Sequence, residues 1–433
     1  MKTKSVCSFE RADFRGWEAV YLRNGFVTLA AVPDIGGRVM AYNLSDYPYL
    51  FVDPDLAGKL FTAEENQGDG SLAAWKNYGG DKTWPSPQGW DDDDQWHGPP
   101  DPVLDTGCYQ LQKLECTDQA ATVQMVSPTD PRTGVQITRQ VTLRQGSSRV
   151  VLDLSFTNIS KRQIRWSIWN VVQLRAERTL PGGGLGLATG CIVTAPLNPR
   201  SRFPRGYYVM FGDENNPQWK TDTTKQLFVG QYLWEIGKVG IDSPAGWIAF
   251  SNNAERYAFT ERFTYFPEAE YPDQGATVEC WTVGRGKVAN LDYEKSQIYL
   301  METEVLSPLY SFKPGETRSF QIEWGACRCD GLVVDMNEAG CTHQPLAGEV
   351  IQDGLKLTGA FGVFDAGQLQ LVWQDRLGNT LGTVSLGKVS PLEMVNMAQI
   401  LQLPAHAASL ELQVVADADG LARKLANSQF QVP

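Results

Sequence analysis

The chain has 433 residues, a net charge of −12 and a sequence pI of about 4.9. An acidic surface repels the phosphates of nucleic acid and of anionic lipid, so neither partner is expected. Aromatic residues make up 11% of the chain, with 13 Trp among them, which suits ring-shaped ligands as well as a large core. The length favours two domains.

The N-terminus, MKTKSVCSFERADF, has two lysines but no apolar run behind them, so no secretory signal is expected. No stretch approaches the roughly 18 apolar residues of a membrane span. The eight cysteines form no CxxC pair and the chain has only three histidines. The four aspartates at 91–94 lack the glycine and the distal glutamate of a calcium loop. We therefore expect a cytoplasmic protein with reduced thiols, no metal and no cofactor.

A hydrophobic period of two predicts strands along most of the chain. In RVVLDLSFTNI, for example, Val150, Leu152, Leu154 and Phe156 share one face. Gly, Pro, Asn and Asp punctuate the gaps between such segments, as turns require. Other predicted strands, in chain order, are FVTLAAV (26–32), RVMAYNL (38–44), VQITRQVTL (135–143), QIRWSIWNVVQL (163–174), GWIAFSN (246–252), RYAFTERFTYF (256–266), TVECWTV (277–283), QIYLMETEVL (297–306) and TRSFQIEWGA (317–326). The prediction is an all-β protein whose sheets stack to bury their apolar faces.

The composition changes after the strand that ends near Trp324. Shorter strands follow, with a Gly-Asn turn between two of them. We therefore expect a large sandwich over residues 1–330 and a small β-sandwich of structural or unknown role over 331–433. Two short helices are expected, around 390–399 and 421–426.

The segment NYGGDKTWPSPQGW (77–90) is too broken for a helix. Gly79 and Gly80 permit positive φ and a close backbone approach, and the prolines force an extended chain. Such a rim loop would hold Lys82 and Trp84 in fixed directions, the lysine toward hydroxyls or a carboxylate and the tryptophan against a sugar face. The alternative is a packed loop whose tryptophan closes the end of the sandwich.

The segment QIYLMETEVL offers paired carboxylates. In a strand, Glu302 and Glu304 project from the same face. Two neighbouring carboxylates raise one another's pKa when desolvated, which suits a general base. The alternative is a pair of exposed edge carboxylates. Glu279 in TVECWTV is a third candidate and shares a face with Trp281.

The segment RWSIWNVVQL places Trp169 on one strand face and Asn170 on the other. Trp169 can serve as a stacking platform or belong to the core. Asn170 is more informative, because an amide in an apolar strand needs hydrogen-bond partners.

The first 330 residues resemble the galactose mutarotase-like superfamily, whose fold is an antiparallel β-supersandwich. The resemblance rests on VPDIGGRVMAYNL, GVQITRQVTL, FTNISKRQIRWSIWNVVQL and ETEVLSPLYSFKPGETRSFQIEWG, in that order along the chain. NYGGDKTWPSPQ is similar to the YGGDKTWP signature of a bacterial subfamily of this superfamily.

The resemblance implies chemistry on a sugar, since aldose mutarotases use a histidine acid and a glutamate base. When the mutarotase motif is aligned with this chain at Trp169–Asn170, its histidine falls on Trp166. None of the three histidines of the chain lies in that strand. The glutamate position falls on Glu304, with Glu302 next. Lys82 is the cation expected to replace the missing acid.

We therefore expect a carbohydrate pocket on the concave face, acting on a small or oligomeric sugar as an aldose 1-epimerase-like isomerase. The alternatives are a sugar-binding module without catalysis and a glycoside hydrolase or lyase. The expected catalytic residues are Glu304, Glu302 and Lys82, and the expected substrate-binding residues are Arg38, Tyr78, Asp81, Trp84, Trp169, Asn170, Arg262 and Glu279.

Overall fold

The computed structural model describes residues 6–92, 94–288, 291–294 and 297–430. Nearly all regular structure within these residues is antiparallel strand, so the predicted all-β class is confirmed. Helix is confined to α1 (Ala63–Gln67) and the single turns η1 (Pro33–Ile35), η2 (Leu72–Ala74) and η3 (Asp273–Gly275).

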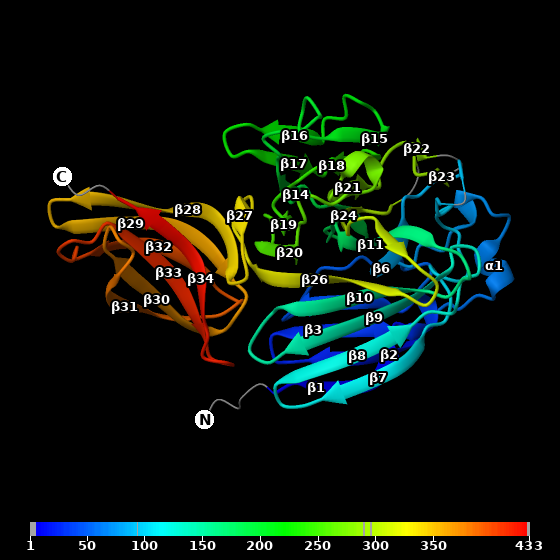
Figure 1. The fold of residues 1–433 in the computed structure, drawn as a ribbon, viewed down its shortest axis with the longest axis horizontal. Coiled ribbons are helices and arrows are strands. Elements are labelled where there is room, and N and C mark those ends of the chain that lie inside the picture. Colours follow the sequence, from blue (N-terminus) through cyan, green and yellow to red (C-terminus); the bar gives the residue numbers. More distant parts are fainter. Residues whose placement is uncertain (1–5, 93, 289–290, 295–296, 431–433) are drawn as a thin grey trace.

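The largest sheet has ten strands and crosses the whole main body (Figure 1). Strands from the middle of the chain form one half and earlier strands form the other, joined through β26. In spatial order the strands are β16 (Trp219–Asp222), β17 (Leu227–Gln231), β14 (Cys191–Pro196), β19 (Trp247–Asn252), β20 (Tyr257–Phe263), β26 (Thr317–Arg328), β10 (Val150–Asn158), β9 (Val135–Arg144), β8 (Ala120–Val126) and β7 (Gln110–Cys116).

A seven-stranded sheet carries the candidate site. Its longest strand, β11, pairs with three other strands along its length. The strands are β15 (Tyr208–Gly212), β18 (Gly237–Ile241), β21 (Val278–Thr282), β24 (Leu300–Leu306), β11 (Ile164–Arg175) and β25 (Tyr310–Phe312) in spatial order, with β6 (Asp81–Ser86) also paired to β11.

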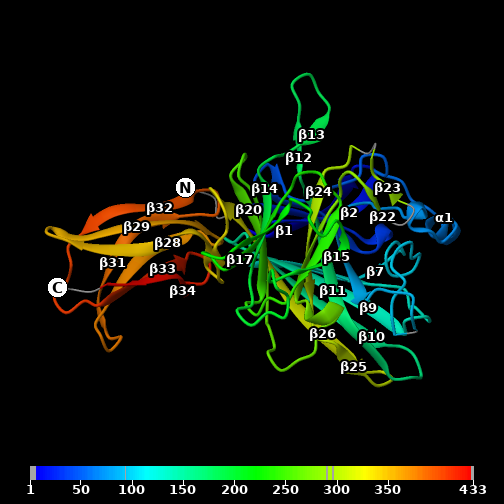
Figure 2. The ribbon, with the colours of Figure 1, turned by 90° about the horizontal axis from the view of Figure 1, so that it is seen from above.

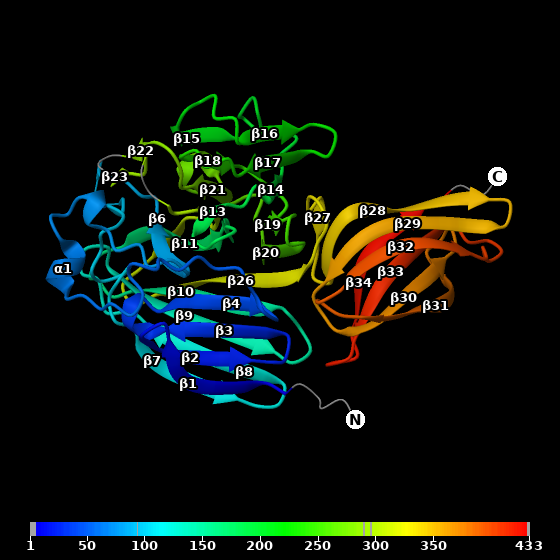
Figure 3. The ribbon, with the colours of Figure 1, turned by 180° about the vertical axis from the view of Figure 1, so that it is seen from behind.

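The N-terminal strands form a five-stranded meander that packs face to face on the β7–β10 half of the largest sheet (Figures 1 and 3). Its strands are β1 (Ser8–Phe14), β2 (Trp17–Arg23), β3 (Val27–Val32), β4 (Arg38–Leu44) and β5 (Tyr47–Pro48). Two small ribbons complete the main body, β12 (Glu177–Thr179) with β13 (Leu185–Leu187), which projects from it (Figure 2), and β22 (Lys287–Val288) with β23 (Leu291–Asp292).

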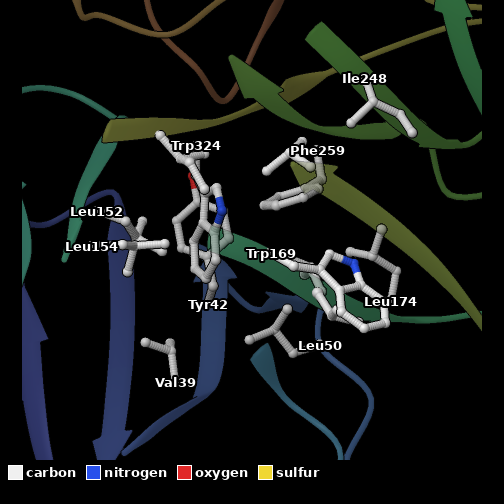
Figure 4. Packing of buried hydrophobic residues seen from close by; sticks show 14 of the residues in the cluster. Val39, Tyr42, Leu50, Leu152, Leu154, Trp169, Leu174, Ile248, Phe259 and Trp324 are labelled. Carbon is white, nitrogen blue, oxygen red and sulfur yellow. The ribbon is translucent and has the colours of Figure 1, made fainter. Parts of the chain in front are cut away.

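The three sheets share one hydrophobic core. Tyr42 of the meander lies 5.8 Å from Phe259 and 5.6 Å from Trp324 of the ten-stranded sheet, measured between ring centroids. Figure 4 shows these rings beside Leu174 and Trp169 of β11. Burying one such side chain contributes about 1.5–3 kcal/mol, so this core fixes how the sheets stack beneath the site.

The C-terminal strands form two four-stranded sheets beside the main body (Figures 1 and 2). They enclose a separate cluster that includes Leu355, Leu371 and Leu412. The sheets are β27 (Asp335–Met336), β28 (Gly340–Ile351), β29 (Gly354–Val363) and β32 (Met394–Leu401), and β31 (Thr380–Val389), β30 (Gly367–Gln374), β33 (Ser409–Ala416) and β34 (Ala422–Gln429). The division at residue 330 stays a prediction.

The two expected helices are wrong. Residues 394–401 form β32 and residues 422–429 form β34. In β32 the buried Val395 and Met397 alternate with the exposed Asn396 and Ala398, which is a strand period. The apolar positions were too few for their period to be read correctly from the sequence.

The segment 77–90 is not the expected rim loop, because its centre is strand β6, with all six residues buried. The two glycines before it do have positive φ, 97° at Gly79 and 70° at Gly80. A Cβ at these positions would lie 2.3 Å from Phe51 O and 2.5 Å from Val39 O, respectively. The glycines therefore let the chain pass close to its neighbours before it enters the sheet.

Candidate functional site

A small pocket opens on the face of the seven-stranded sheet. Its volume is about 110 Å³, somewhat below the roughly 150 Å³ cavity that accepts benzene in an engineered protein. The pocket therefore encloses part of one ring, with the rest of the ligand outside. It is lined by Leu72, Trp75, Trp84, Gln88, Pro99, Trp169, Phe211, Lys238, Trp281 and Glu302.

Strand register sets the order of the polar groups in this pocket. Glu302 of β24 is paired with Gln173 on one side and with Trp281 on the other. Trp281 is in turn paired with Lys238 of β18. The backbones of Glu302 and Lys238 are thus two strands apart, about 10 Å, with the backbone of Trp281 between them, and the side chain of Lys238 reaches across β21 to Glu304 of β24.

Glu302 is a candidate general base. Its Oε1 accepts hydrogen bonds from Lys82 Nζ at 3.1 Å and from Gln173 Nε2 at 2.6 Å. Burial raises the pKa of Glu302, and the Lys82 ammonium opposes that shift. A carboxylate with a raised pKa accepts a proton more readily at neutral pH. Burial also lowers the pKa of Lys82, against the attraction of Glu302.

Lys238 joins the other two carboxylates of the cluster. Its Nζ lies 2.9 Å from Glu304 Oε2 and 2.7 Å from Glu279 Oε2. It also lies 4.4 Å from the ring centroid of Trp169, whose Nε1 donates to Glu304 Oε2 at 2.8 Å. Burial would lower the pKa of Lys238, but Glu279 and Glu304 outweigh it and raise that pKa above its ordinary value. Lys238 is therefore protonated at neutral pH where it lines the pocket.

The tryptophan walls are held from behind by a buried carboxylate. Trp75 Nε1 donates to Asp105 Oδ2 at 2.9 Å and Trp84 Nε1 to Asp105 Oδ1 at 3.2 Å. The guanidinium of Arg38 is paired with the same carboxylate, and both side chains are fully buried. Two pocket walls thus depend on one ion pair. Trp281 also lines the pocket, and its Nε1 is buried with no hydrogen-bond partner among the described residues.

Several predicted site residues lie away from the pocket. Arg38 lies behind Trp84, where its guanidinium bonds Asp105 and the carbonyl oxygens of Ile35 and Gly79. Asp81 is paired with the buried Arg139 beneath the site.

Three others also point elsewhere. Tyr78 belongs to a core cluster and meets Trp17 edge-on at 5.9 Å. Asn170 faces the core side of β11, where its Oδ1 accepts from Thr83 Oγ1 at 2.9 Å. Arg262 is on the ten-stranded sheet and donates to Glu323 at 2.9 Å.

Of the remaining predicted residues, Trp84, Trp169 and Glu302 line the pocket, and Lys82, Glu279 and Glu304 lie directly beneath it. Sequence reasoning missed Lys238, Gln173, Trp75 and Asp105. For Lys238 the sequence held a usable indication. Lys238 is the charged residue of the otherwise uncharged segment GKVGI, which forms a strand of five buried residues, and a buried lysine needs an acidic partner.

The described residues contain no group of three or more His, Cys, Asp or Glu side chains placed to hold a metal ion. Asp93, one of the four predicted loop aspartates, lies outside them. None of the described helices is long and apolar enough to cross a membrane.

Residues 18–181 match a family model described as a domain of unknown function (DUF4380). No curated protein matches the chain. Among solved structures, a putative aldose 1-epimerase from Klebsiella pneumoniae aligns with a TM-score of 0.50 and 11% identity, covering 75% of this chain and 83% of that one. The fold is that of the galactose mutarotase-like proteins. A galactose mutarotase-like protein from Clostridium acetobutylicum aligns with a TM-score of 0.46 and 11% identity, over 75% of this chain and 99% of that one.

A TPR-domain containing protein from Parabacteroides distasonis also aligns, with a TM-score of 0.43 and 13% identity. The match covers 71% of this chain and spans 46% of that longer one. Within the galactose mutarotase-like sandwich, the family-model region ends at residue 181 and includes Lys82, Trp84 and Trp169. The three glutamates and Lys238 lie beyond it.

Proposed function

We propose that the pocket binds a single sugar ring and transfers protons at its anomeric carbon, interconverting the two anomers. The observation that carries this proposal is that Glu302 and Lys238 line the same pocket from strands on either side of β21. Opening a hemiacetal ring needs a base on the anomeric hydroxyl and an acid on the ring oxygen, placed on two sides of the carbon between them.

The tryptophan walls support a sugar as the ligand. Trp84, Trp169 and Trp281 line the pocket, and the small ring surface that they leave exposed suits the apolar C–H side of a pyranose ring. Glu302 and Lys238 offer an acceptor and a donor for its hydroxyls. A small apolar pocket with a few convergent polar groups is typical of a small-molecule site.

In the proposed reaction Glu302 removes the proton of the anomeric hydroxyl while the bond from C1 to the ring oxygen breaks. Lys238 gives its proton to that oxygen, so the products are an open-chain aldehyde and a new hydroxyl. Rotation about C1 and reversal of both transfers close the ring as the other anomer. Glu302 takes the role expected for Glu304, because Glu302 lines the pocket and Glu304 is fully buried beneath Lys238 and Trp169.

Lys82 is not given the role of the acid. Its ammonium donates to Glu302 Oε1 at 3.1 Å and lies 4.9 Å from the ring centroid of Trp84, so it orients the base instead. A hydrolase has less support. It needs two carboxyl groups facing the ligand roughly 5–10 Å apart, and only Glu302 does so among the described residues.

The test is anomer exchange measured by NMR magnetisation transfer on a panel of aldoses, with binding measured by calorimetry. Glu302→Gln is expected to lower the exchange rate by about 10²–10⁴-fold with little change in affinity. Glu18→Gln, an exposed glutamate with 71% of its side chain accessible, is the matched control and should match the wild type. Binding without exchange in the wild-type protein would make this a sugar-binding module.

A further inference from the structure

The pocket floor holds more buried negative charge than positive charge. Glu279 and Glu304 are fully buried and Glu302 is 4% exposed, against two buried lysines, Lys82 and Lys238. If all five groups are ionised, one negative charge has no counterion. An unpaired buried charge costs several kcal/mol, and proteins avoid that cost by keeping such a group neutral. One of the three carboxyl groups should therefore hold a proton.

The hydrogen bonds identify which one. Glu302 has Lys82 and Gln173 on its Oε1. Glu304 has Lys238 and the indole N–H of Trp169 on its Oε2. Glu279 shares Lys238 at 2.7 Å, and neither of its oxygens accepts a well-aligned hydrogen bond from any described residue. Glu279 is thus the carboxyl group least able to stay ionised.

The groups that surround Glu279 do not change this result. Glu304 faces it across the ladder from β24 and repels its charge. Tyr208 of β15 has its hydroxyl committed to the Asp273 carbonyl at 2.8 Å, so it does not donate to Glu279. The Asp273 carboxyl, from η3, adds further repulsion, and Lys238, from β18, attracts the charge. Burial, with these two acids, raises the pKa of Glu279 well above its ordinary value.

We propose that Glu279 holds a proton at neutral pH and passes it to Lys238 once Lys238 has protonated the ring oxygen of the sugar. The transfer to Lys238 rests on the proposed function, whereas the proton on Glu279 does not. Glu279 does not line the pocket, so it acts through Lys238 as a proton store.

The transfer balances without any further reactant. Ring opening leaves Lys238 as a neutral amine, and its nitrogen lone pair takes the proton from Glu279 across the 2.7 Å contact. Glu279 becomes a carboxylate, paired at once with the ammonium it has restored. Ring closure returns the proton of the sugar hydroxyl to this pair and restores the starting state. The store thus replaces the histidine acid that the sequence lacks.

Infrared difference spectroscopy tests the first half without any substrate. The spectrum of the wild type minus that of Glu279→Gln, at neutral pH, should contain the C=O stretch of a protonated carboxylic acid. Glu261→Gln provides the matched positive control. Glu261 is another fully buried glutamate, and burial raises its pKa to about 8. It faces Thr303 and Trp324 on the core side, and its band should appear in the same way.

A band for Glu261 but none for Glu279 overturns the inference. If Glu279→Gln fails to fold, the wild-type spectrum answers the same question once the Glu261 band is subtracted. The carboxylic acid band that remains should also be present in Lys238→Met and should disappear as pH rises. Absence of that remaining band refutes the proton store.

The second half has a kinetic test. Glu279→Gln should lower kcat by about 10²-fold with KM unchanged. It should also remove the loss of rate that we expect for the wild type at alkaline pH, where Glu279 ionises. A purely structural residue would leave the shape of the pH profile unaltered, and that result overturns the relay. An infrared band without anomer exchange on any sugar leaves the proton store standing and refutes the proposed function instead.

Discussion

Replacing Asp105 with alanine should destabilise the protein by about 4 kcal/mol and loosen the pocket. Asp105 lies at the centre of a buried arrangement in which the Arg38 guanidinium and the indoles of Trp75 and Trp84 all point at one carboxylate. Its removal leaves a fully buried cation without a counterion, since the side chain of Arg38 has no exposed surface.

The magnitude follows from these partners. Breaking a buried ion pair by removing one member costs about 3–5 kcal/mol. Each unpaired indole N–H adds about 1 kcal/mol. Three carbonyl oxygens, of Ile35, Gly79 and residue 105 itself, stay within 3.3 Å of the guanidinium and reduce the total. Asp105→Asn keeps one acceptor oxygen and the side-chain shape, so about half of the loss is expected.

The assay is urea unfolding followed by near-ultraviolet circular dichroism, with sugar affinity measured in parallel. Glu18→Gln, which breaks the exposed 3.4 Å pair with Arg11, should cost less than about 1 kcal/mol. The double variant Arg38→Met with Asp105→Leu should recover much of the stability, because it removes both buried charges. A loss below about 1 kcal/mol in Asp105→Ala would refute the view that this ion pair supports the pocket walls.

Two further outcomes are expected. The folded protein keeps a proton on Glu261, whose pKa is about 8 against an ordinary 4.5, so the contribution of Glu261 to stability should fall between about pH 5 and pH 8 and level off above. In urea titrations, Glu261→Gln should make the slope of stability against pH shallower by up to about 1.4 kcal/mol per pH unit. An unchanged slope would contradict the assignment. Arg262→Ala should leave sugar affinity and exchange unaltered, since Arg262 is paired with Glu323 on the other sheet; a tenfold weaker affinity would return Arg262 to the site.

The predicted part of the site is the part that strand alternation controls. Glu302 and Glu304 could be placed on one face because successive residues of a strand point in opposite directions, and Thr303 does point the other way, to Glu261. The same rule separates Trp169 from Asn170. Trp169 lines the pocket, whereas Asn170, included with it as a substrate-binding residue, faces the core.

The rest depends on contacts that no local pattern reveals. Lys238 reaches Glu304 only because β21 lies between β18 and β24, and that order comes from packing of the whole sheet. Arg38 has the chemistry of a ligand clamp, but Asp105, 67 positions later, draws it behind the tryptophans. Pairings over such distances are set by the tertiary fold, so residue type alone did not separate an internal ion pair from a binding group.

The distance along the chain between Lys82 and Glu302 also affects the nascent chain during translation. The two residues are 220 positions apart. At translation rates of 5–20 residues per second, the acid emerges from the ribosome on the order of ten to forty seconds after the lysine. Throughout that interval the tryptophan beside the lysine has no completed sheet to cover it. The nascent chain is therefore exposed to aggregation at this strand, and chaperones that hold apolar segments should bind it there.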